Sequence, residues 1–355
     1  MLDSAVGNAA VRSFRRETRL PAHAHHCTGD STRGRQSLRV AETPYNRSRF
    51  SMQQSALAFR DADDFVRGLS PFLEMGAYEW LWAQPGVTFE KIADRFRARP
   101  DALPSDFVPH DLARATAHDV VATLAAHEVQ RFGLAINQTY EYPKALRDAR
   151  HPLEMLYYLG SWNLVETNAI AVVGTRKPSP EVLTETAALA QALVANDWTI
   201  VSGLAEGIDT QAHETALAAG GRTIAVIGTA ISEAYPRANA DLQRRIADAF
   251  LVVSQVPVLR YYQQEWMQNR SFFPERNITM SALTLGTVIV EASDRSGTLI
   301  QARAALQQGR KLFILDRCFH DPERKWPHEY VRQGAIRVHD HAEIVEALRD
   351  VHRDR

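Results

Sequence analysis

The sequence predicts an α/β fold in which an extended, Rossmann-like, doubly wound and mainly parallel sheet follows a small helical domain. The first observation is a regular alternation of short apolar runs with stretches of helical periodicity from about residue 169 onward. The second is that the apolar runs break into small or polar residues before each helix begins, as in the segment 170–176. This alternation is typical of strands joined by right-handed helical crossovers, with ligands bound where the strands end.

The expected elements follow from the spacing of apolar residues. Six apolar runs are the expected strands, at 169–173, 199–202, 223–227, 250–253, 287–291 and 311–315. Apolar residues at helical spacing predict helices at 180–196, 209–219, 239–248, 275–284 and 297–308. Two more short runs, 133–136 and 155–160, are expected at the entry to the sheet, and a final helix at 341–349 is expected on its edge.

Three regions are expected along the chain. Residues 1–51 are rich in Arg, Ser, Thr and His without periodic apolar spacing, which predicts a disordered extension, and Met52 is a candidate for the true start. Residues 52–134 predict a small helical domain that ends in a long amphipathic helix at 115–132. Helical packing is favoured there over a helix-turn-helix that contacts nucleic acid. Residues 135–355 predict the Rossmann-like domain.

Composition excludes several classes of protein. The net charge of −1 hides an asymmetry, because residues 1–50 carry nine arginines and four acidic residues, which leaves −6 for the remainder. A nucleic-acid interface would therefore depend on a local track of arginines rather than on a general positive field. Two cysteines predict no disulfide framework, and no apolar run is long enough to span a bilayer. A cytoplasmic protein without membrane contact is expected.

The loop after the run 169–173 has the chemistry of a phosphate contact. Gly174 permits a sharp turn, and the N–H groups of the helix that begins near Ser179 can bind an anion. Thr175 and Arg176 lie between them, and a guanidinium can add a bidentate phosphate contact. The loop is neither a G-x-G-x-x-G fingerprint nor a Walker A loop. Taken alone, it is better explained by a solvent-exposed arginine in an ordinary turn.

A second loop, Ser202–Asp209, follows the next expected strand. Its two glycines, Gly203 and Gly207, allow a backbone nest for a phosphate. Asp209 is a good N-cap, and His213 lies one helical turn later on the same side. The pair predicts a structural hydrogen bond rather than catalysis, because no serine or cysteine nucleophile lies beside it in an evident elbow.

A third loop, Tyr235-Pro-Arg-Ala-Asn239, follows the strand expected at 223–227. Arg237 is expected on the same rim as Arg176, and Asn239 is expected to cap the next helix.

The segment Arg270-Ser-Phe-Phe-Pro-Glu-Arg-Asn277 interleaves two arginines with two phenylalanines. This pattern is typical of a track for single-stranded nucleic acid, in which cations contact phosphates and an aromatic face stacks on a base. The alternative is that Phe272 and Phe273 belong to the core, and one of them is expected there.

Six motifs, taken in order over about residues 140–345, resemble those of the DNA-processing protein A family (DprA/Smf). They are Tyr142-Pro-x-x-Leu146, Val173-Gly-Thr-Arg-x-x-Ser179, Ser202-Gly-Leu-Ala-x-Gly-Ile-Asp-x-x-Ala-His213, Tyr235-Pro-x-x-Asn239, Phe273-Pro-x-Arg-Asn277 and Glu291-Ala-x-x-x-Ser-Gly-Thr298. The resemblance implies a homodimer that binds single-stranded DNA without marked sequence preference and loads a RecA-type recombinase.

The resemblance also implies which residues contact DNA. The family's basic contacts fall on Arg176 and Arg237, with Arg270 as a further candidate, and a stacking role falls on Phe273. The full expected DNA-binding set is Gly174, Thr175, Arg176, Ser179, Ser202, Gly203, Gly207, Arg237, Asn239, Arg270, Phe273, Arg276, Asn277, Ser296, Gly297 and Thr298.

The chain departs from the family pattern at Gln255 and Ile278, where the family has Glu and Arg. Two other functions therefore remain open. One is a nucleotide-ligand sensor in a phage-defence or toxin–antitoxin system. The other is a phosphoribohydrolase of the LOG type, which ranks last because no glutamate follows Ser296-Gly-Thr298 to stabilise an oxocarbenium-like centre.

A non-enzymatic protein without cofactor or metal is expected. The cluster His23–Cys27 predicts no metal site, because no fold is predicted to hold its ligands.

Overall fold

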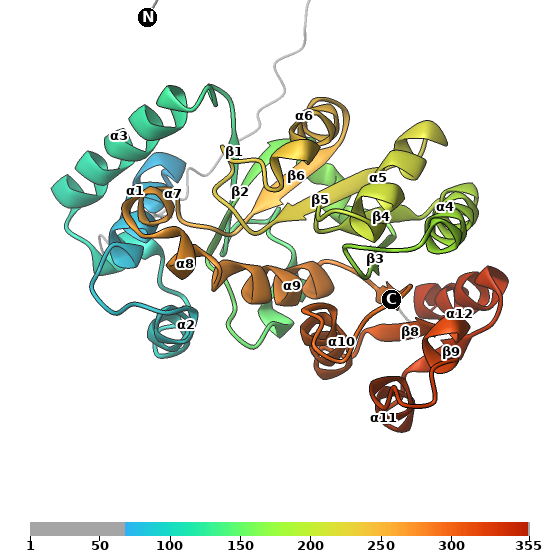
Figure 1. The fold of residues 1–355 in the computed structure, drawn as a ribbon. Coiled ribbons are helices and arrows are strands. Elements are labelled where there is room, and N and C mark those ends of the chain that lie inside the picture. Colours follow the sequence, from blue (N-terminus) through green and yellow to red (C-terminus); the bar gives the residue numbers. More distant parts are fainter. Residues whose placement is uncertain (1–67, 354–355) are drawn as a thin grey trace, which may run out of the picture. The chain divides into compact units, whose positions relative to one another are not determined.

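The computed structural model describes residues 68–353, with side chains through Arg349 (Figure 1). The predictions for residues 1–51 and for Met52, and the first part of the expected helical domain, lie outside the described residues. The described residues belong to one compact unit, Val66–Arg355. The division near residue 134 stays a prediction.

Three helices and a 3-10 turn precede the sheet: α1 (Pro71–Trp82), α2 (Phe89–Arg97), η2 (Pro104–Phe107) and α3 (His110–Ala126). Helix α1 packs closely on α3, because Gly76 has no side chain where a Cβ would lie 1.9 Å from the carbonyl oxygen of Ala113. The helix expected at 115–132 begins earlier and ends earlier. Small buried residues such as Ala113 extend its inner face, and the chain leaves the helix at Glu128, which has a φ of 64°.

Nine strands form one sheet in the order β1-β2-β6-β5-β4-β3-β7-β8-β9. Strands β1 and β2 are antiparallel to each other, β2 is antiparallel to β6, and the remaining pairs are parallel. The mainly parallel, doubly wound sheet predicted from the sequence is confirmed. The strands are β1 (Gly133–Ile136), β2 (Met155–Gly160), β3 (Ala169–Val173), β4 (Thr199–Ser202), β5 (Thr223–Ile227), β6 (Leu251–Ser254), β7 (Gly286–Ile289), β8 (Lys311–Leu315) and β9 (Ile336–Val338).

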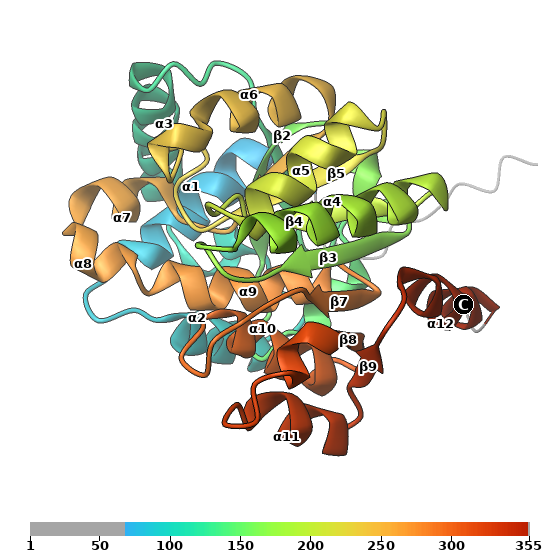
Figure 2. The same cartoon turned by 45° about the vertical axis from the view of Figure 1, so that its right-hand side comes forward.

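Helices cover both faces of the sheet (Figures 1 and 2). One face carries α4 (Pro180–Ala195), α5 (Ile208–Ala218), α6 (Ala240–Ala249) and α12 (His341–Arg353). The other face carries α9 (Phe272–Ala282) and α10 (Thr298–Gln307). Each layer closes over buried apolar side chains, and the burial of that surface is the main force that holds the layers together.

Three short helices were not expected from the sequence: α7 (Val258–Gln263), α8 (Trp266–Asn269) and α11 (Trp326–Arg332). They are too short to show helical periodicity in the sequence. The remaining elements are 3-10 turns: η3 (Lys144–Asp148), η4 (Trp162–Glu166), η5 (Arg237–Asn239) and η6 (Asp316–Phe319).

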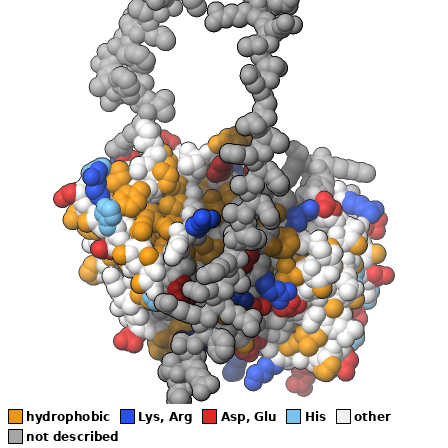
Figure 3. Space-filling model, turned by 90° about the horizontal axis from the view of Figure 1, so that it is seen from above, with side chains coloured by type: hydrophobic (Ala, Val, Ile, Leu, Met, Phe, Trp, Pro, Cys, Tyr) orange, Lys and Arg blue, Asp and Glu red, His pale blue; other side chains and the backbone are white. Residues whose placement is uncertain are grey.

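Charges on the face shown in Figure 3 are mixed, since acidic and basic side chains alternate over the part that is not grey. Hydrophobic side chains gather on its left, the side on which α3 lies in Figure 1, and α3 exposes Leu112 and Val121. Across residues 68–353, no helix has both the length and the hydropathy that crossing a membrane would require.

Candidate functional site

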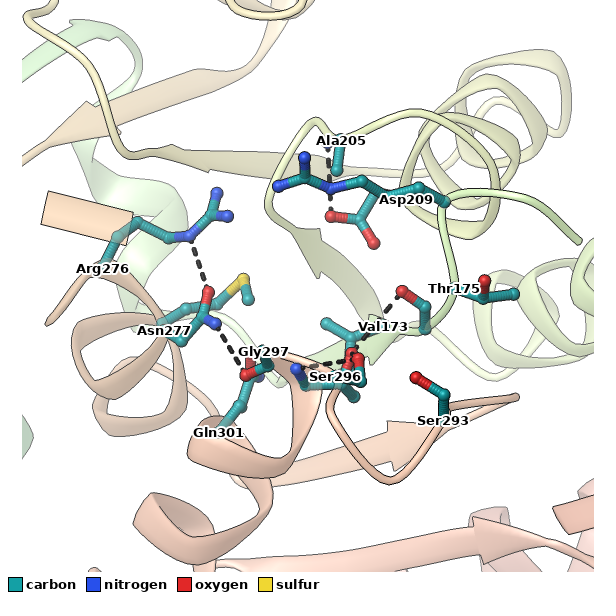
Figure 4. A pocket seen from close by; sticks show the side chains of 14 residues that line it. Val173, Thr175, Ala205, Asp209, Arg276, Asn277, Ser293, Ser296, Gly297 and Gln301 are labelled. Carbon is teal, nitrogen blue, oxygen red and sulfur yellow. Dashed lines mark hydrogen bonds between the residues drawn. The ribbon is translucent and has the colours of Figure 1, made fainter. Parts of the chain in front are cut away.

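A cavity of about 310 Å³ opens at the carboxyl ends of β3, β4 and β7, where a doubly wound sheet binds its ligands (Figure 4). Its walls come from the loops after these strands, from α9 and from the first turn of α10. The charged groups among its lining residues are Arg176, Asp209 and Arg276, so the local balance is positive.

The loop after β3 passes through a narrow gap. A Cβ on Gly174 would lie 2.3 Å from Ile208 Cδ1 and 2.8 Å from the Glu291 carbonyl oxygen, so only glycine fits there. The Thr175 N–H donates to that same carbonyl at 2.8 Å and holds the loop in place. Arg176 follows as an exposed side chain, with no carboxylate partner within the described part of the chain.

The loop after β4 differs from the expected phosphate nest. The N–H groups of Gly203 and Ala205 donate to Asp209 Oδ2 at 3.1 and 3.3 Å, so a carboxylate already occupies the position expected for an anion. Gly207 has a φ of 79°, and a Cβ there would lie 2.6 Å from the Thr175 carbonyl oxygen. The glycine therefore permits the two loops to touch. Ser202 is fully buried and donates to the Val172 carbonyl oxygen at 2.7 Å.

Asp209 and His213 do not form the expected structural pair. Helix α5 begins at Ile208 with Gly207 at the N-cap position, so Asp209 lies in the first turn. Burial raises the pKa of Asp209, and the nearby charge of Arg276 offsets part of that rise. The Nδ1 atom of His213 is instead paired with Thr223 Oγ1 at 2.7 Å, and burial lowers the histidine pKa to about 3. His213 is therefore a buried neutral residue of the core.

Arg276 is a buried structural tie on α9. It is 5% exposed and donates to the carbonyl oxygens of Gly203 and Val226 at 2.5 and 2.6 Å, which join α9 to the ends of β4 and β5. Gly203 makes this possible, because a Cβ there would lie 2.4 Å from the guanidinium. Burial lowers the pKa of Arg276 to about 10, so the group keeps its charge at neutral pH.

Asn277 extends this network across the cavity. Its Oδ1 accepts from Arg276 Nε at 2.8 Å, and its Nδ2 donates to the Gly297 carbonyl oxygen at 3.1 Å. Figure 4 shows Arg276 and Asn277 on the side of the cavity opposite Thr175. Asn239 also forms a structural hydrogen bond, but it lines neither cavity. Its side chain does not cap α6 and instead donates to the Leu204 carbonyl oxygen at 2.9 Å, in the loop after β4.

The N-terminus of α10 faces the cavity. Gly297 is at its N-cap position, and the Thr298 N–H donates to Ser296 Oγ at 3.2 Å. The positive end of a helix dipole favours an anion at this position. Ser179, in contrast, caps α4 by accepting from the Val182 N–H at 3.5 Å and does not line the cavity.

A smaller cavity of about 70 Å³ adjoins Arg176, Tyr235 and Phe273. Phe273 is half-buried, whereas Phe272 is 2% exposed and packs on Phe89 with ring centroids 5.9 Å apart. This confirms that one of the two phenylalanines belongs to the core. The aromatic neighbour that sequence reasoning missed is Trp266 of α8, an exposed tryptophan in a segment otherwise rich in polar residues.

The structure brings together ten of the sixteen expected residues. Eight line the large cavity, namely Gly174, Thr175, Arg176, Arg276, Asn277, Ser296, Gly297 and Thr298. Two line the small one, Gly203 and Phe273. The six that line neither are Ser179, Ser202, Gly207, Arg237, Asn239 and Arg270, of which Arg237 and Arg270 are exposed.

Metal ligation finds no support among residues 68–353, where no group of three or more His, Cys, Asp or Glu side chains could hold an ion. The His23–Cys27 cluster lies outside the described residues.

A doubly wound sheet with a cationic cavity at its carboxyl edge defines the protein as Rossmann-like, with a cavity whose charge suits an anionic ligand. The family model described as DNA recombination-mediator protein A matches residues 134–349, and the chain belongs to this family. It is 33% identical over 226 residues to the DNA processing protein DprA of Bacillus subtilis, covering 63% of this chain and 74% of the relative. It is 36% identical over 211 residues to the protein Smf of Escherichia coli, covering 58% and 54%.

Two solved structures are also similar. The DNA processing protein A of Streptococcus pneumoniae superposes with a TM-score of 0.56 at 29% identity, covering 79% of this chain and 93% of that one. The Helicobacter pylori protein of the same name superposes with a TM-score of 0.53 at 26% identity, covering 62% and 96%, and its structure concerns its unique single-stranded DNA binding mode. The matched segments span between 50% and 74% of the curated relatives.

Proposed function

We propose that this protein binds single-stranded DNA and acts as a recombination mediator, with the DNA backbone held at the large cavity. The observation that carries the proposal is Arg176, an exposed arginine without a carboxylate partner among residues 68–353, at the mouth of the cavity. A guanidinium there can bind one phosphate through two parallel hydrogen bonds. The N-terminus of α10 lies across the same cavity and favours the same negative charge.

Arg276 supports the site indirectly. Its charge balances Asp209, so the carboxylate does not cancel the attraction of Arg176 for a phosphate. Arg237 and Arg270 are exposed on the neighbouring segments and extend the cationic track beyond the cavity. The track is local, and the charges on the face shown in Figure 3 are mixed, so binding should depend on these few side chains.

Preference for single strands follows from the shape of the site. The cavity of about 310 Å³ can accept the backbone, and the aromatic side chains Tyr235 and Phe273 of the adjoining small cavity can contact unstacked bases. In a duplex the bases are paired inside and cannot reach these side chains. The proposed role is binding rather than catalysis, since the buried His213 pairs with Thr223 and has no access to a ligand.

The proposal includes two partners that the family resemblance implies, a second copy of the chain and a RecA-type recombinase. A dimer would hold one strand on two tracks, which raises affinity through effective concentration without new contacts. Sedimentation of the full chain should show mostly dimer at about 10 μM if the Kd is about 1 μM or lower. A monomer at that concentration would contradict the homodimer.

A second candidate function is the binding of a free nucleotide, because the cavity is closed on several sides and its volume falls at the lower end of small-ligand sites. Competition separates the two functions. If a mononucleotide displaces a single-stranded oligonucleotide of about 20 nucleotides at an equal concentration of phosphate groups, nucleotide binding is favoured. If the oligonucleotide stays bound, single-stranded DNA binding is favoured.

The decisive experiment is Arg176→Ala. The loss of a hydrogen bond to a charged group costs about 1.5–3 kcal/mol, so single-stranded DNA affinity should fall roughly 10- to 150-fold. Arg176→Lys should recover part of the loss, since charge remains but the forked geometry does not. The matched control is Arg114→Ala, which removes one exposed arginine from α3 and should leave affinity nearly unchanged.

Two outcomes would contradict the proposal. Equal affinity of Arg176→Ala and wild type for DNA would place the DNA track elsewhere. Unfolding of Arg176→Ala would make Arg176 a structural residue.

A further inference from the structure

We propose that Trp266 stacks on a base of the bound strand and forms, with Tyr235 and Phe273, an aromatic platform beside the phosphate cavity. The inference rests on the proposed function and names the part of the ligand that this rim contacts. The three rings come from α8, from the loop after β5 and from α9. Their centroids are 4.9 Å apart for Tyr235 and Trp266, 5.6 Å for Tyr235 and Phe273, and 6.3 Å for Trp266 and Phe273.

The exposure of this platform distinguishes it from a core cluster. Trp266 is 42% exposed and Tyr235 39%, although both belong to the same three-ring contact. Phe273 is anchored on its other side, because its ring fills the space above Gly228, where a Cβ would lie 2.6 Å from Phe273 Cδ1. Exposed apolar side chains that gather in one place and are rimmed by polar residues are a candidate binding surface, whereas single exposed ones are common.

The charges around the platform favour nucleic acid as the occupant. Arg176 borders the same small cavity as Tyr235 and Phe273, so a phosphate on Arg176 places the adjoining base at the rings. Arg237 lies two residues after Tyr235, Arg270 lies three before Phe273, and neither has a carboxylate partner among the described residues. Cations interleaved with aromatic faces are the general chemistry of single-strand binding.

The exposed Glu206 also borders the small cavity. Its carboxylate repels a phosphate, so this position suits the uncharged base rather than the backbone.

Helix α8 is held in place from a distant part of the chain. The Glu79 carboxylate of α1 accepts from the Val258 N–H at 2.6 Å and from the Leu259 N–H at 3.1 Å, which fixes the start of α7. The buried Asn269 of α8 in turn donates to the Tyr261 carbonyl oxygen of α7 at 3.0 Å. The helices before the sheet thereby position Trp266, which assigns them a part in DNA binding without contact to DNA.

The test compares two oligonucleotides of equal length, one with bases and one with abasic sites throughout. Removal of one stacking side chain costs a strand about 5- to 150-fold in affinity, so Trp266→Ala should weaken the base-bearing strand by that factor. The Trp266→Ala variant should bind the abasic strand with the affinity of the wild type. Trp266→Phe should recover most of the affinity, and Met267→Ala, which removes a 70% exposed neighbour, should leave both affinities unchanged.

The outcomes separate the platform from the site it adjoins. If Trp266→Ala keeps the DNA affinity of the wild type while Arg176→Ala loses affinity, the proposed stacking role of Trp266 is wrong and the proposed function still holds. Equal weakening for both strands also overturns it, because it indicates a structural role for Trp266. Wild-type protein that binds neither strand overturns the proposed function.

Discussion

Two buried carboxylates of this protein, Asp209 and Glu79, accept backbone N–H groups in the same manner but lie in opposite surroundings. Asp209 accepts from Gly203 and Ala205 beside the cavity, and the charge of Arg276 offsets part of the rise that burial causes in its pKa. Glu79 accepts from the first residues of α7 and from the Tyr157 hydroxyl at 2.6 Å, and burial raises its pKa to about 7.

The difference teaches how one chemical group serves two purposes. At the cavity, the carboxylate shapes a loop, and Arg276 balances its charge, so that Arg176 stays free for a ligand. At α7, the carboxylate joins α1 to β2 and α7 and has no cation among the groups that bond to it. The first arrangement keeps a positive site, and the second holds two segments that are distant in the sequence.

The largest effect is expected for Arg276→Ala. The substitution leaves the buried Asp209 without a counter-charge and removes the donors to the Gly203 and Val226 carbonyls, so unfolding free energy should fall by about 3–5 kcal/mol. This loss in unfolding free energy can be measured by urea unfolding. Arg176→Ala is the control and should change stability by less than about 0.5 kcal/mol. Similar losses for the two arginines would remove the distinction between them.

Glu79→Ala should have the next largest effect. It leaves the N–H groups of Val258 and Leu259 and the Tyr157 hydroxyl without their acceptor in a buried region, which should cost about 2–4 kcal/mol. Glu79→Gln keeps one acceptor oxygen and should lose less. If Glu79→Ala is as stable as the wild type in urea unfolding, the carboxylate does not hold α7.

The dependence of folding stability on pH also differs between the two regions. It involves Glu79 of α1 in one and the buried His213 of α5, four residues after Asp209, in the other. The folded pKa of Glu79, about 7, exceeds its unfolded value of 4.5, so its protonated form stabilises the fold below pH 4.5 and that contribution is lost as the pH rises through 7. His213 acts in the opposite sense, because its pKa is lowered to about 3 and its contribution is lost as the pH falls below 6.5.

The comparison of wild type with Glu79→Gln isolates the carboxylate. The stability of the variant relative to the wild type should rise by about 2 kcal/mol between pH 5 and pH 7. A difference that stays flat across this range would show that Glu79 is ionised throughout in the folded protein.

The smallest effect is the salt dependence of DNA binding. Three exposed arginines, Arg176, Arg237 and Arg270, should give a log–log slope of about −2 with single strands, at about −0.7 for each phosphate neutralised. Arg176→Ala should make the slope shallower by about 0.7. A slope near zero, measured by fluorescence anisotropy over 50–200 mM salt, would exclude the arginine track.

The sequence by itself determined the order of the parallel elements and placed the loop of Arg176 at the carboxyl edge of the sheet. Apolar runs define β3, β4, β5 and β8 at the observed bounds, because a strand buried on both faces needs a continuous apolar segment. The loop from Gly174 to Arg176 lies at the carboxyl edge as expected, because crossover connections place every loop of that kind on one edge.

Only the tertiary structure decided which polar residues are free. Arg176 and Arg276 look alike in the sequence, yet one is exposed and the other is 5% exposed and bonded to the ends of two strands. Trp266 likewise meets Tyr235 and Phe273 in a fold where α8 bonds to α7 and the Val258 N–H of α7 bonds to Glu79 of α1, 179 residues earlier in the chain. Local patterns report the period of an element, whereas burial and pairing depend on contacts between segments that the chain brings together only when it folds.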